Sequence, residues 1–275
     1  MMVYRFGWVL VLIICSIVRC RMAKGNYTLD SVRDVLVREE DSIIFGLIER
    51  AKFPLNANTY TQNYSNIPSF GASLLNFVVI NTEAVQAKGG RYKNPEENPF
   101  FPEKLPPSLV KPYPFTQFLH AGASSININK CIWKFYIDKL LIQWFDSLGD
   151  DGNYAQTAAS DLSLLQAISR RIHYGKFVAE VKFRESPKKY EPLIRAKDKE
   201  GLMKLLTVKS VEEMVIKRVE KKAMVYGKDV TLNNDDKKNE TKYKVDPLVV
   251  STLYKKWLIP LTKDAEVEYL LQRLD

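Results

Sequence analysis

Two cations, Arg171 and Lys182, lie eleven residues apart in the proline-free segment SRRIHYGKFVAEVK, residues 169–182. The Ala, Lys, Glu and Arg residues of this segment favour a helix. Eleven residues make about three helical turns, so both cations project from the same face. Between them on that face lie only small or short side chains, those of Gly175, Val178 and Ala179. A helix face with a cation at each end and a shallow floor between them can bind a small dianion.

Two less specific explanations remain open for this segment. Arg171 and Lys182 could be ordinary solvated cations on a helix surface. A glycine inside a helix costs about 1 kcal/mol relative to alanine, so Gly175 requires a reason. That reason is either room for a ligand to approach the backbone or close contact with another helix.

The segment RRIHYGKFVAE resembles the central helix of the all-helical chorismate mutases of fungi and plants. The segments VRDVLVREEDSIIFGLIERAKF, residues 32–53, and PEENPFFPE, residues 95–103, carry the same resemblance. It extends over residues 28–275. It implies an all-α, single-domain homodimer that rearranges chorismate to prephenate in the phenylalanine and tyrosine branch of aromatic amino-acid biosynthesis. The alternative is a secreted helical protein of the same fold that binds a partner without catalysis.

The resemblance implies that three residues bind the substrate carboxylates. Arg33 and Arg171 would hold one carboxylate each, because the planar guanidinium group can contact a carboxylate at two points. Thr262 would add a hydroxyl contact. Without the resemblance, Arg33 would be interpreted as a surface residue beside an apolar helix stripe.

The resemblance also assigns residues to the ether oxygen and the hydroxyl of the substrate. Lys182 would donate a hydrogen bond to the breaking ether oxygen, and Glu266 would donate to the same oxygen when protonated. Glu212 would accept the substrate hydroxyl. Thr262 and Glu266 are one helical turn apart and share a face. Fungal members have an asparagine four residues before the equivalent of Glu212, where this chain has Val208, so that side-chain contact is missing here.

Such a rearrangement is intramolecular and pericyclic, and it requires no nucleophile, metal or cofactor. It requires a folded substrate and stabilisation of the charge that grows on the ether oxygen. The sequence has only two histidines, no Gly-rich phosphate loop and no His or Cys cluster with metal-ligand spacing. We therefore expect no cofactor and no metal.

Regulated members of the family bind aromatic amino acids at a second site near the dimer interface. There the central helix begins with a Gly-Ser pair and has a threonine three residues later. In this chain Ala155 stands at the glycine position, Gln156 at the serine position and Ala159 at the threonine position. In the loop before Tyr92, Gly90 stands where the fungal pattern has an arginine, although Arg91 remains. We therefore expect a degenerate effector site and an unregulated enzyme, unless Thr157 supplies the missing hydroxyl.

The composition is typical of a mainly helical protein with a substantial core: 275 residues, 46% hydrophobic, only 12 glycines. The net charge of +9 suggests nucleic acid as a partner. However, the basic residues alternate with acids, as in EEMVIKRVEKK, and no zinc-finger, RNA-recognition or basic-zipper motif is present. We expect no nucleic-acid partner.

Apolar periodicity predicts helices over residues 28–53, 73–92, 127–145, 154–183, 196–206, 211–226 and 246–274. The last is either a pair of helices or one helix kinked at Pro260. Seven prolines between residues 95 and 114 exclude regular structure and predict an ordered crossing loop anchored by aromatic residues. The polar segment 233–244 is predicted to be a flexible surface loop.

Residues 1–20 have one cation, Arg5, before an apolar run from Phe6 to Val18, which is short for a membrane span. We interpret them as a secretory signal peptide whose removal leaves residues 21–275 outside any membrane. An uncleaved anchor, or a misassigned start codon and a cytoplasmic protein, remain alternatives. Only Cys131 would survive cleavage, so no internal disulfide is expected.

Overall fold

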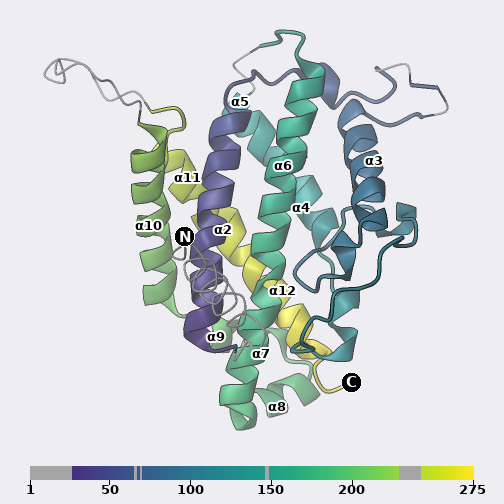
Figure 1. The fold of residues 1–275 in the computed structure, drawn as a ribbon. Helices are drawn as coiled ribbons and strands as arrows, with labels where there is room; N and C mark the ends of the chain where they lie inside the picture. The colour runs from purple at the N-terminus through teal and green to yellow at the C-terminus, as the bar shows by residue number, and fades with distance from the viewer. Residues whose placement is uncertain (1–26, 65–66, 69, 146–148, 229–242) are drawn as a thin grey trace, which may run out of the picture.

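The computed structural model describes residues 27–64, 67–68, 70–145, 149–228 and 243–275. This part of the chain is helical and has no β-strand beyond an isolated bridge between Lys228 and Tyr243, so the expected all-α fold is confirmed (Figure 1). The α-helices are α2 (Leu29–Arg50), α3 (Leu74–Lys88), α4 (Asn129–Phe135), α5 (Ile142–Phe145), α6 (Tyr154–His173), α7 (Gly175–Glu185), α8 (Pro187–Arg195), α9 (Lys199–Leu206), α10 (Lys209–Gly227), α11 (Pro247–Leu253) and α12 (Ile259–Leu271).

Helix α2 begins at a capping box. The Thr28 Oγ1 accepts a hydrogen bond from the Ser31 amide, and the Ser31 Oγ accepts one from the Thr28 amide. The apolar stripe predicted for this helix is buried at Val32, Ile43 and Leu47. That stripe packs α2 against α6, and the two long helices run side by side through the molecule, with α10 and α11 on one side and α3 and α4 on the other (Figure 1).

The predicted central helix over 154–183 is divided at Tyr174 into α6 and α7. Helix α7 lies just beyond the end of α6, so the face shared by Arg171 and Lys182 is preserved across the junction (Figure 1). Two apolar clusters surround this spine. One contains Ile43 of α2 and Leu165 of α6, and the other contains Phe177 of α7 and Leu270 of α12.

The structure corrects several predicted boundaries. The predicted helices leave residues 184–195 unassigned, where Pro187 and Pro192 lie, but the structure has helix α8 there. Pro187 stands at the start of the helix, where a missing N–H has no cost, and the short helix buries Tyr190 and Ile194. For residues 246–274, predicted as a pair of helices or one helix kinked at Pro260, the structure has α11 and α12 joined by a π-helical turn, Tyr254–Leu258. Pro260 lies in the first turn of α12 and not at the junction.

The proline-rich segment is an ordered loop that crosses α6 and α7. Its backbone amides at Phe100 and Phe101 donate to the buried Glu83 carboxylate, at 2.8 and 3.0 Å. Both phenylalanine rings meet the edge of Trp133. Most of the predicted polar loop 233–244 lies outside the described residues.

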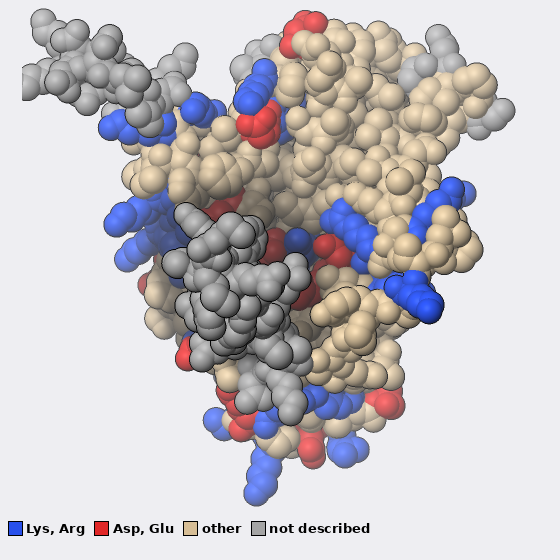
Figure 2. Space-filling view, in the orientation of Figure 1, with Lys and Arg blue, Asp and Glu red and all other residues tan. Residues whose placement is uncertain are grey.

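Acidic and basic side chains are interspersed over the face shown in Figure 2, and both kinds gather in a hollow near its centre. Ion pairs from Arg170 to Glu39 and Glu97 join α6, α2 and the crossing loop. A mixture of signs differs from the single basic stripe typical of nucleic-acid binding.

Candidate active site

All six residues that the sequence analysis assigned to the substrate line one cavity of about 150 Å³: Arg33, Arg171, Lys182, Glu212, Thr262 and Glu266. They come from five helices, α2, α6, α7, α10 and α12. The remaining wall is mainly apolar. A cavity that combines several charged side chains with a mainly apolar wall is suited to bind a small charged molecule.

Arg171 is 4% exposed at the end of α6. Its Nη1 donates to the Thr262 Oγ1 at 3.1 Å, and that hydroxyl donates to the Leu258 carbonyl at 2.6 Å. The Arg171 Nε is buried and has no hydrogen-bond acceptor among the described residues. A buried guanidinium donor without an acceptor is costly unless a ligand supplies one, so an anion bound here would satisfy Arg171. Arg33 has a 44% exposed side chain, 3.8 Å from Asp30, and therefore lies at the rim.

Lys182 and Glu266 face each other across the cavity. The Lys182 Nζ is 3.7 Å from the Glu266 Oε2, beyond hydrogen-bond distance, and it donates to the Leu206 carbonyl at 3.1 Å. The Glu266 Oε2 is buried and has no hydrogen-bond partner among the described atoms. Burial raises the pKa of Glu266, and the positive charges of Lys182 and Arg171 only partly oppose it. This carboxyl group is therefore suited to hold a proton.

Glu212 lies in the first turn of α10 and pairs with Lys263 at 2.9 Å. Lys263 also donates to the Thr207 Oγ1 at 3.3 Å. Sequence reasoning missed Lys263, although it is the neighbour of Thr262 on α12. This lysine fixes the direction in which the Glu212 carboxylate points.

Arg218 is a second cavity residue that sequence reasoning missed. It stands seven residues after Val211, two helical turns along the same face of α10, but Val211 was not itself an assigned site residue and this spacing alone did not single Arg218 out. Its guanidinium group binds the buried Glu40 in two-point fashion, at 2.8 and 2.6 Å. Val208 also lines the cavity, at the N-cap of α10, so the departure from the fungal asparagine leaves an apolar side chain in the wall.

Gly175 marks a close contact between helices rather than an opening for a ligand. A Cβ atom at this position would come within 2.9 Å of the Thr262 Cγ2 and 3.0 Å of the Thr262 carbonyl oxygen. The glycine thus lets α12 approach α7 closely enough to bring Thr262 and Glu266 to the cavity.

The residues predicted to form a degenerate effector site are not adjacent within one chain. Gly90 adopts a left-handed conformation, with φ +84°, and Arg91 binds Glu97 at 2.8 Å and Gln166 at 2.7 Å. The other positions, Ala155, Gln156 and Ala159, are exposed in the first two turns of α6. Gln166 is eleven residues from Ala155, about 16 Å along the helix. Thr157 is buried and accepts a hydrogen bond from Asn56, so it does not offer a hydroxyl to a ligand.

Comparison with known proteins decides the family. The model of the family described as chorismate mutase type II matches residues 153–267. The Arabidopsis thaliana protein named chorismate mutase 2 is 56% identical over 249 residues, which are 90% of this chain and 94% of that protein. The chain belongs to the chorismate mutase type II family. It is an isomerase that rearranges chorismate to prephenate, and the alternative of a non-catalytic binding protein is set aside.

Solved structures of the family agree with the fold. The crystal structure of AtCM1 with phenylalanine bound in its allosteric site is 47% identical with a TM-score of 0.82, covering 92% of this chain and 99% of that one. The Candida albicans Aro7p chorismate mutase in complex with L-Trp is 38% identical with a TM-score of 0.83, covering 90% and 92%.

The expected secretory localisation is wrong. Relatives whose names state a compartment are chloroplastic or cytosolic, as in the two Zea mays enzymes that are 50% and 51% identical to this chain. A short apolar run behind one cation is not specific enough to establish export. The predicted signal segment, residues 1–20, lies outside the described residues. Within the described residues, no helix is long and apolar enough to cross a membrane.

Proposed function

We propose that the cavity lined by Arg33, Arg171, Lys182, Glu212, Thr262 and Glu266 is where chorismate rearranges. The observation that carries this proposal is the pairing of Lys182 with Glu266, whose Oε2 is buried and unpartnered 3.7 Å from the ammonium group. Two donors held at this spacing in a water-poor cavity can both reach one developing negative charge.

The other residues fold and hold the substrate. Arg171, with its Nε unsatisfied, takes one carboxylate, and Thr262 fixes the guanidinium orientation and borders the same carboxylate. Arg33 at the rim takes the second carboxylate, and its exposure allows it to close over a bound ligand. Glu212 accepts the ring hydroxyl. Holding both carboxylates restrains the substrate in its reactive, folded conformation, which lowers the entropic part of the barrier.

The transition state then draws on Lys182 and Glu266. As the ether C–O bond breaks, negative charge grows on its oxygen, and the Lys182 ammonium and the protonated Glu266 carboxyl donate to it. Lys182 and Glu266 both keep their protons through the reaction. Their protonation states are therefore the same after product release as before substrate binding, and no separate proton-transfer step is needed.

Lys182→Ala tests this assignment. Removal of one donor to a developing charge typically costs about 2.7–4 kcal/mol, or about 10²–10³ in kcat. KM should change much less, because the charge exists mainly in the transition state. Steady-state turnover of chorismate provides the measurement, with Lys189→Ala on the exposed part of α8 as the matched control. Near-normal kcat in Lys182→Ala would reject the assignment.

We further propose that the enzyme is a homodimer in which the start of α6 from one copy meets the Arg91 region of the other. The separation of these two regions within a single chain supports this arrangement. Exposed apolar side chains near the Arg91 region also support it, namely Val85, Leu109, Val110 and Tyr113. Sedimentation velocity on the full chain measures the oligomeric state, and a monomer at micromolar concentration would contradict the proposal.

The proposed enzyme is also unregulated. This rests on the methyl groups of Ala155 and Ala159, the bulk of Gln156, and the engagement of Thr157 with Asn56. The solved relatives named above contain Phe or L-Trp. Turnover assays with and without aromatic amino acids should therefore compare the native Ala155-Gln156 start of α6 with a Gly-Ser start.

A further inference from the structure

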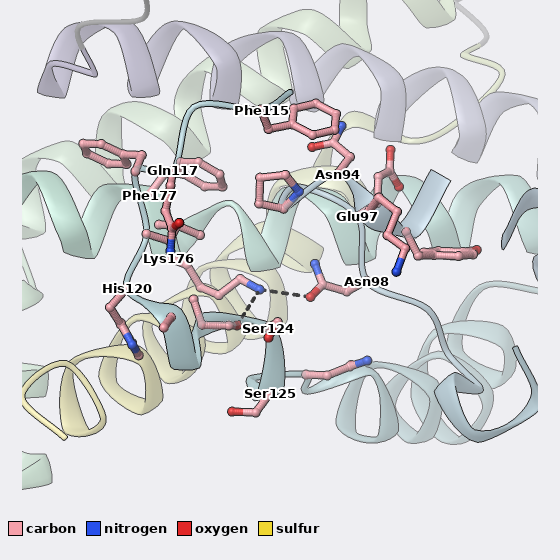
Figure 3. Close-up of a pocket in the computed structure, with 18 of the residues that line it drawn as sticks. Asn94, Glu97, Asn98, Phe115, Gln117, His120, Ser124, Ser125, Lys176 and Phe177 are labelled. Atoms are coloured by element: carbon pink, nitrogen blue, oxygen red, sulfur yellow. Dashed lines mark hydrogen bonds between the residues drawn. The ribbon is translucent and has the colours of Figure 1, made fainter. Parts of the chain in front are cut away.

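A second, larger cavity lies on the other side of α7. It measures about 640 Å³ and is enclosed between α7 and the crossing loop, residues 92–127 (Figure 3). It shares no lining residue with the substrate cavity. Lys176 faces this second cavity, whereas Val178, about 200° further around the helix, faces the first. Its volume is in the range of sites that bind small organic molecules.

Lys176 is the unusual feature of this cavity. It is 2% exposed, yet it forms no ion pair with any described residue. Its Nζ donates to the Asn98 Oδ1 at 3.0 Å and, at the outer limit of 3.4 Å, to the carbonyls of Ala123 and Ile126 (Figure 3). A buried ammonium group without an anionic partner is unfavourable, and burial accordingly lowers the pKa of Lys176 to about 8.

The charged and titratable groups around Lys176 do not neutralise it. His173 on α6 is held neutral, with burial lowering its pKa to about 3. On the loop, Glu97 lines the cavity but its carboxylate is bound by Arg91 at 2.8 Å. Lys93, the other charged lining residue, is itself a cation. His120 also lines the cavity, and burial lowers its pKa, which favours the neutral imidazole. The inner end of the cavity therefore has positive charge without a counter-ion.

The rest of the wall is mixed: polar side chains such as Asn94 and Gln117 line it, and a group of aromatic and apolar side chains forms the remainder. Phe115, Phe118 and Phe177 border the cavity, together with Leu105 and prolines of the loop. Figure 3 shows the ammonium group of Lys176 pointing toward the Asn98 side chain, to which it is hydrogen-bonded. A carboxylate could replace the two long carbonyl contacts with shorter, charge-assisted bonds, while the aromatic rings surround an apolar body.

We propose that this cavity is a second ligand site, which binds a small organic carboxylate through Lys176 Nζ and encloses its apolar part among Phe115, Phe118 and Phe177. The site is distinct from the substrate cavity and does not include the start of α6. It adjoins the Arg91 region, because Asn94, Glu97 and Phe115 line both hollows, but Arg91 itself does not line it.

Phenylacetate is a suitable probe, measured by isothermal titration calorimetry on the full chain at pH 7, with uncharged phenylacetamide beside it. Phenylacetate should bind at least about tenfold more tightly than phenylacetamide, because only the anion can pair with the ammonium group. Its affinity should fall as the pH rises through about 8, where Lys176 loses its proton. Equal affinities, or no binding at millimolar probe, would overturn the proposal.

Three variants locate the binding. Lys176→Met removes the charge at similar length and should weaken phenylacetate binding at least about tenfold, whereas Arg33→Met, which removes a proposed carboxylate-binding group from the rim of the substrate cavity, should leave it unchanged. Should Lys176→Met fail to fold, Ser124→Trp provides a second test, because this exposed residue lines the cavity and an indole there would block it. Loss of binding in Arg33→Met alone would assign the probe to the substrate cavity and overturn the proposal.

Discussion

Glu266 has a buried carboxyl group, and the positive charges of Lys182, Arg171 and Lys263 oppose the effect of burial on its pKa only in part. Desolvation favours the neutral acid, which is the form that can donate a hydrogen bond. The same group would be a poor donor on an exposed helix surface, where it would be ionised at neutral pH. The buried environment of Glu266, rather than its being a glutamate, therefore decides that its carboxyl group can act as a hydrogen-bond donor.

The pH profile of Glu266→Gln follows from this. In the native enzyme the pKa of Glu266 is raised, so the active neutral form persists to higher pH than for an ordinary glutamate and activity falls as the group ionises. A glutamine donates at every pH, and the alkaline decline of kcat should flatten. Measurement of kcat from pH 5 to 9 compares the two enzymes. A decline that is identical in both would exclude Glu266 as the titrating donor.

In the proposed site Lys263 would act on the substrate through Glu212, so its replacement should affect binding more than chemistry. Lys263→Met removes the 2.9 Å ion pair and frees the carboxylate to rotate. We expect KM to rise several-fold, about 1 kcal/mol, with a smaller change in kcat. Lys263→Arg retains the charge and should restore most of the loss. A kcat defect as large as that of Lys182→Ala would indicate direct contact with the reacting atoms instead.

Among the elements, the α7–α12 pair determines the geometry of the site. Helix α12 supplies Thr262 and Glu266, and α7 supplies Lys182, so the distance between the two helices sets the distance between donors. The contact at Gly175 leaves no space for a methyl group. The buried ion pair Arg50–Asp161, at 2.6 Å, similarly fixes α2 against α6 at the opposite end of the molecule.

Gly175→Ala should damage both stability and activity. Alanine gains about 1 kcal/mol in helix propensity, but its Cβ would meet the backbone of α12, and overpacking costs about 1–3 kcal/mol. We expect a small net loss in the free energy of unfolding by urea and a larger loss of kcat, since Thr262 and Glu266 must move. Gly89→Ala is the control, because its Cβ meets no atom closer than 3.4 Å. Unchanged turnover in Gly175→Ala would show that the α7–α12 spacing does not limit the rate.

For the whole molecule, the expected behaviour is near-hyperbolic kinetics without a response to aromatic amino acids. Turnover at sub-saturating chorismate is measured with and without excess Trp, Tyr or Phe. The double variant Ala155→Gly with Gln156→Ser restores the pattern of regulated members, and a response that appears only in the variant would support the assignment. A several-fold effect of any of the three amino acids on the native enzyme would contradict it.

The sequence by itself determined the helices whose apolar stripes are long and uninterrupted. Residues 28–53 are the clearest case, because a 3.6-residue stripe and a capping threonine are local signals. It also supplied the family, through segments such as RRIHYGKFVAE, and with the family the six residues that we propose bind the substrate and that line one cavity. It did not determine the compartment, because the apolar run at residues 6–18 is compatible with several targeting outcomes.

Only the tertiary structure decided which side chains meet. From the sequence, Gly175 could either make room for a ligand or allow close packing of another helix. The contact with Thr262 shows that it allows α12 to pack closely against α7. In the sequence, Lys263 and Arg218 look like ordinary surface charges, because the partner of each lies on a different helix. Lys263 of α12 pairs with Glu212 of α10, and Arg218 of α10 pairs with Glu40 of α2. Helix α8 forms despite two prolines because burial of Tyr190 and Ile194 outweighs local propensity. Lys176 was one cation among many until folding removed it from water and left it without a counter-ion, which no local pattern encodes.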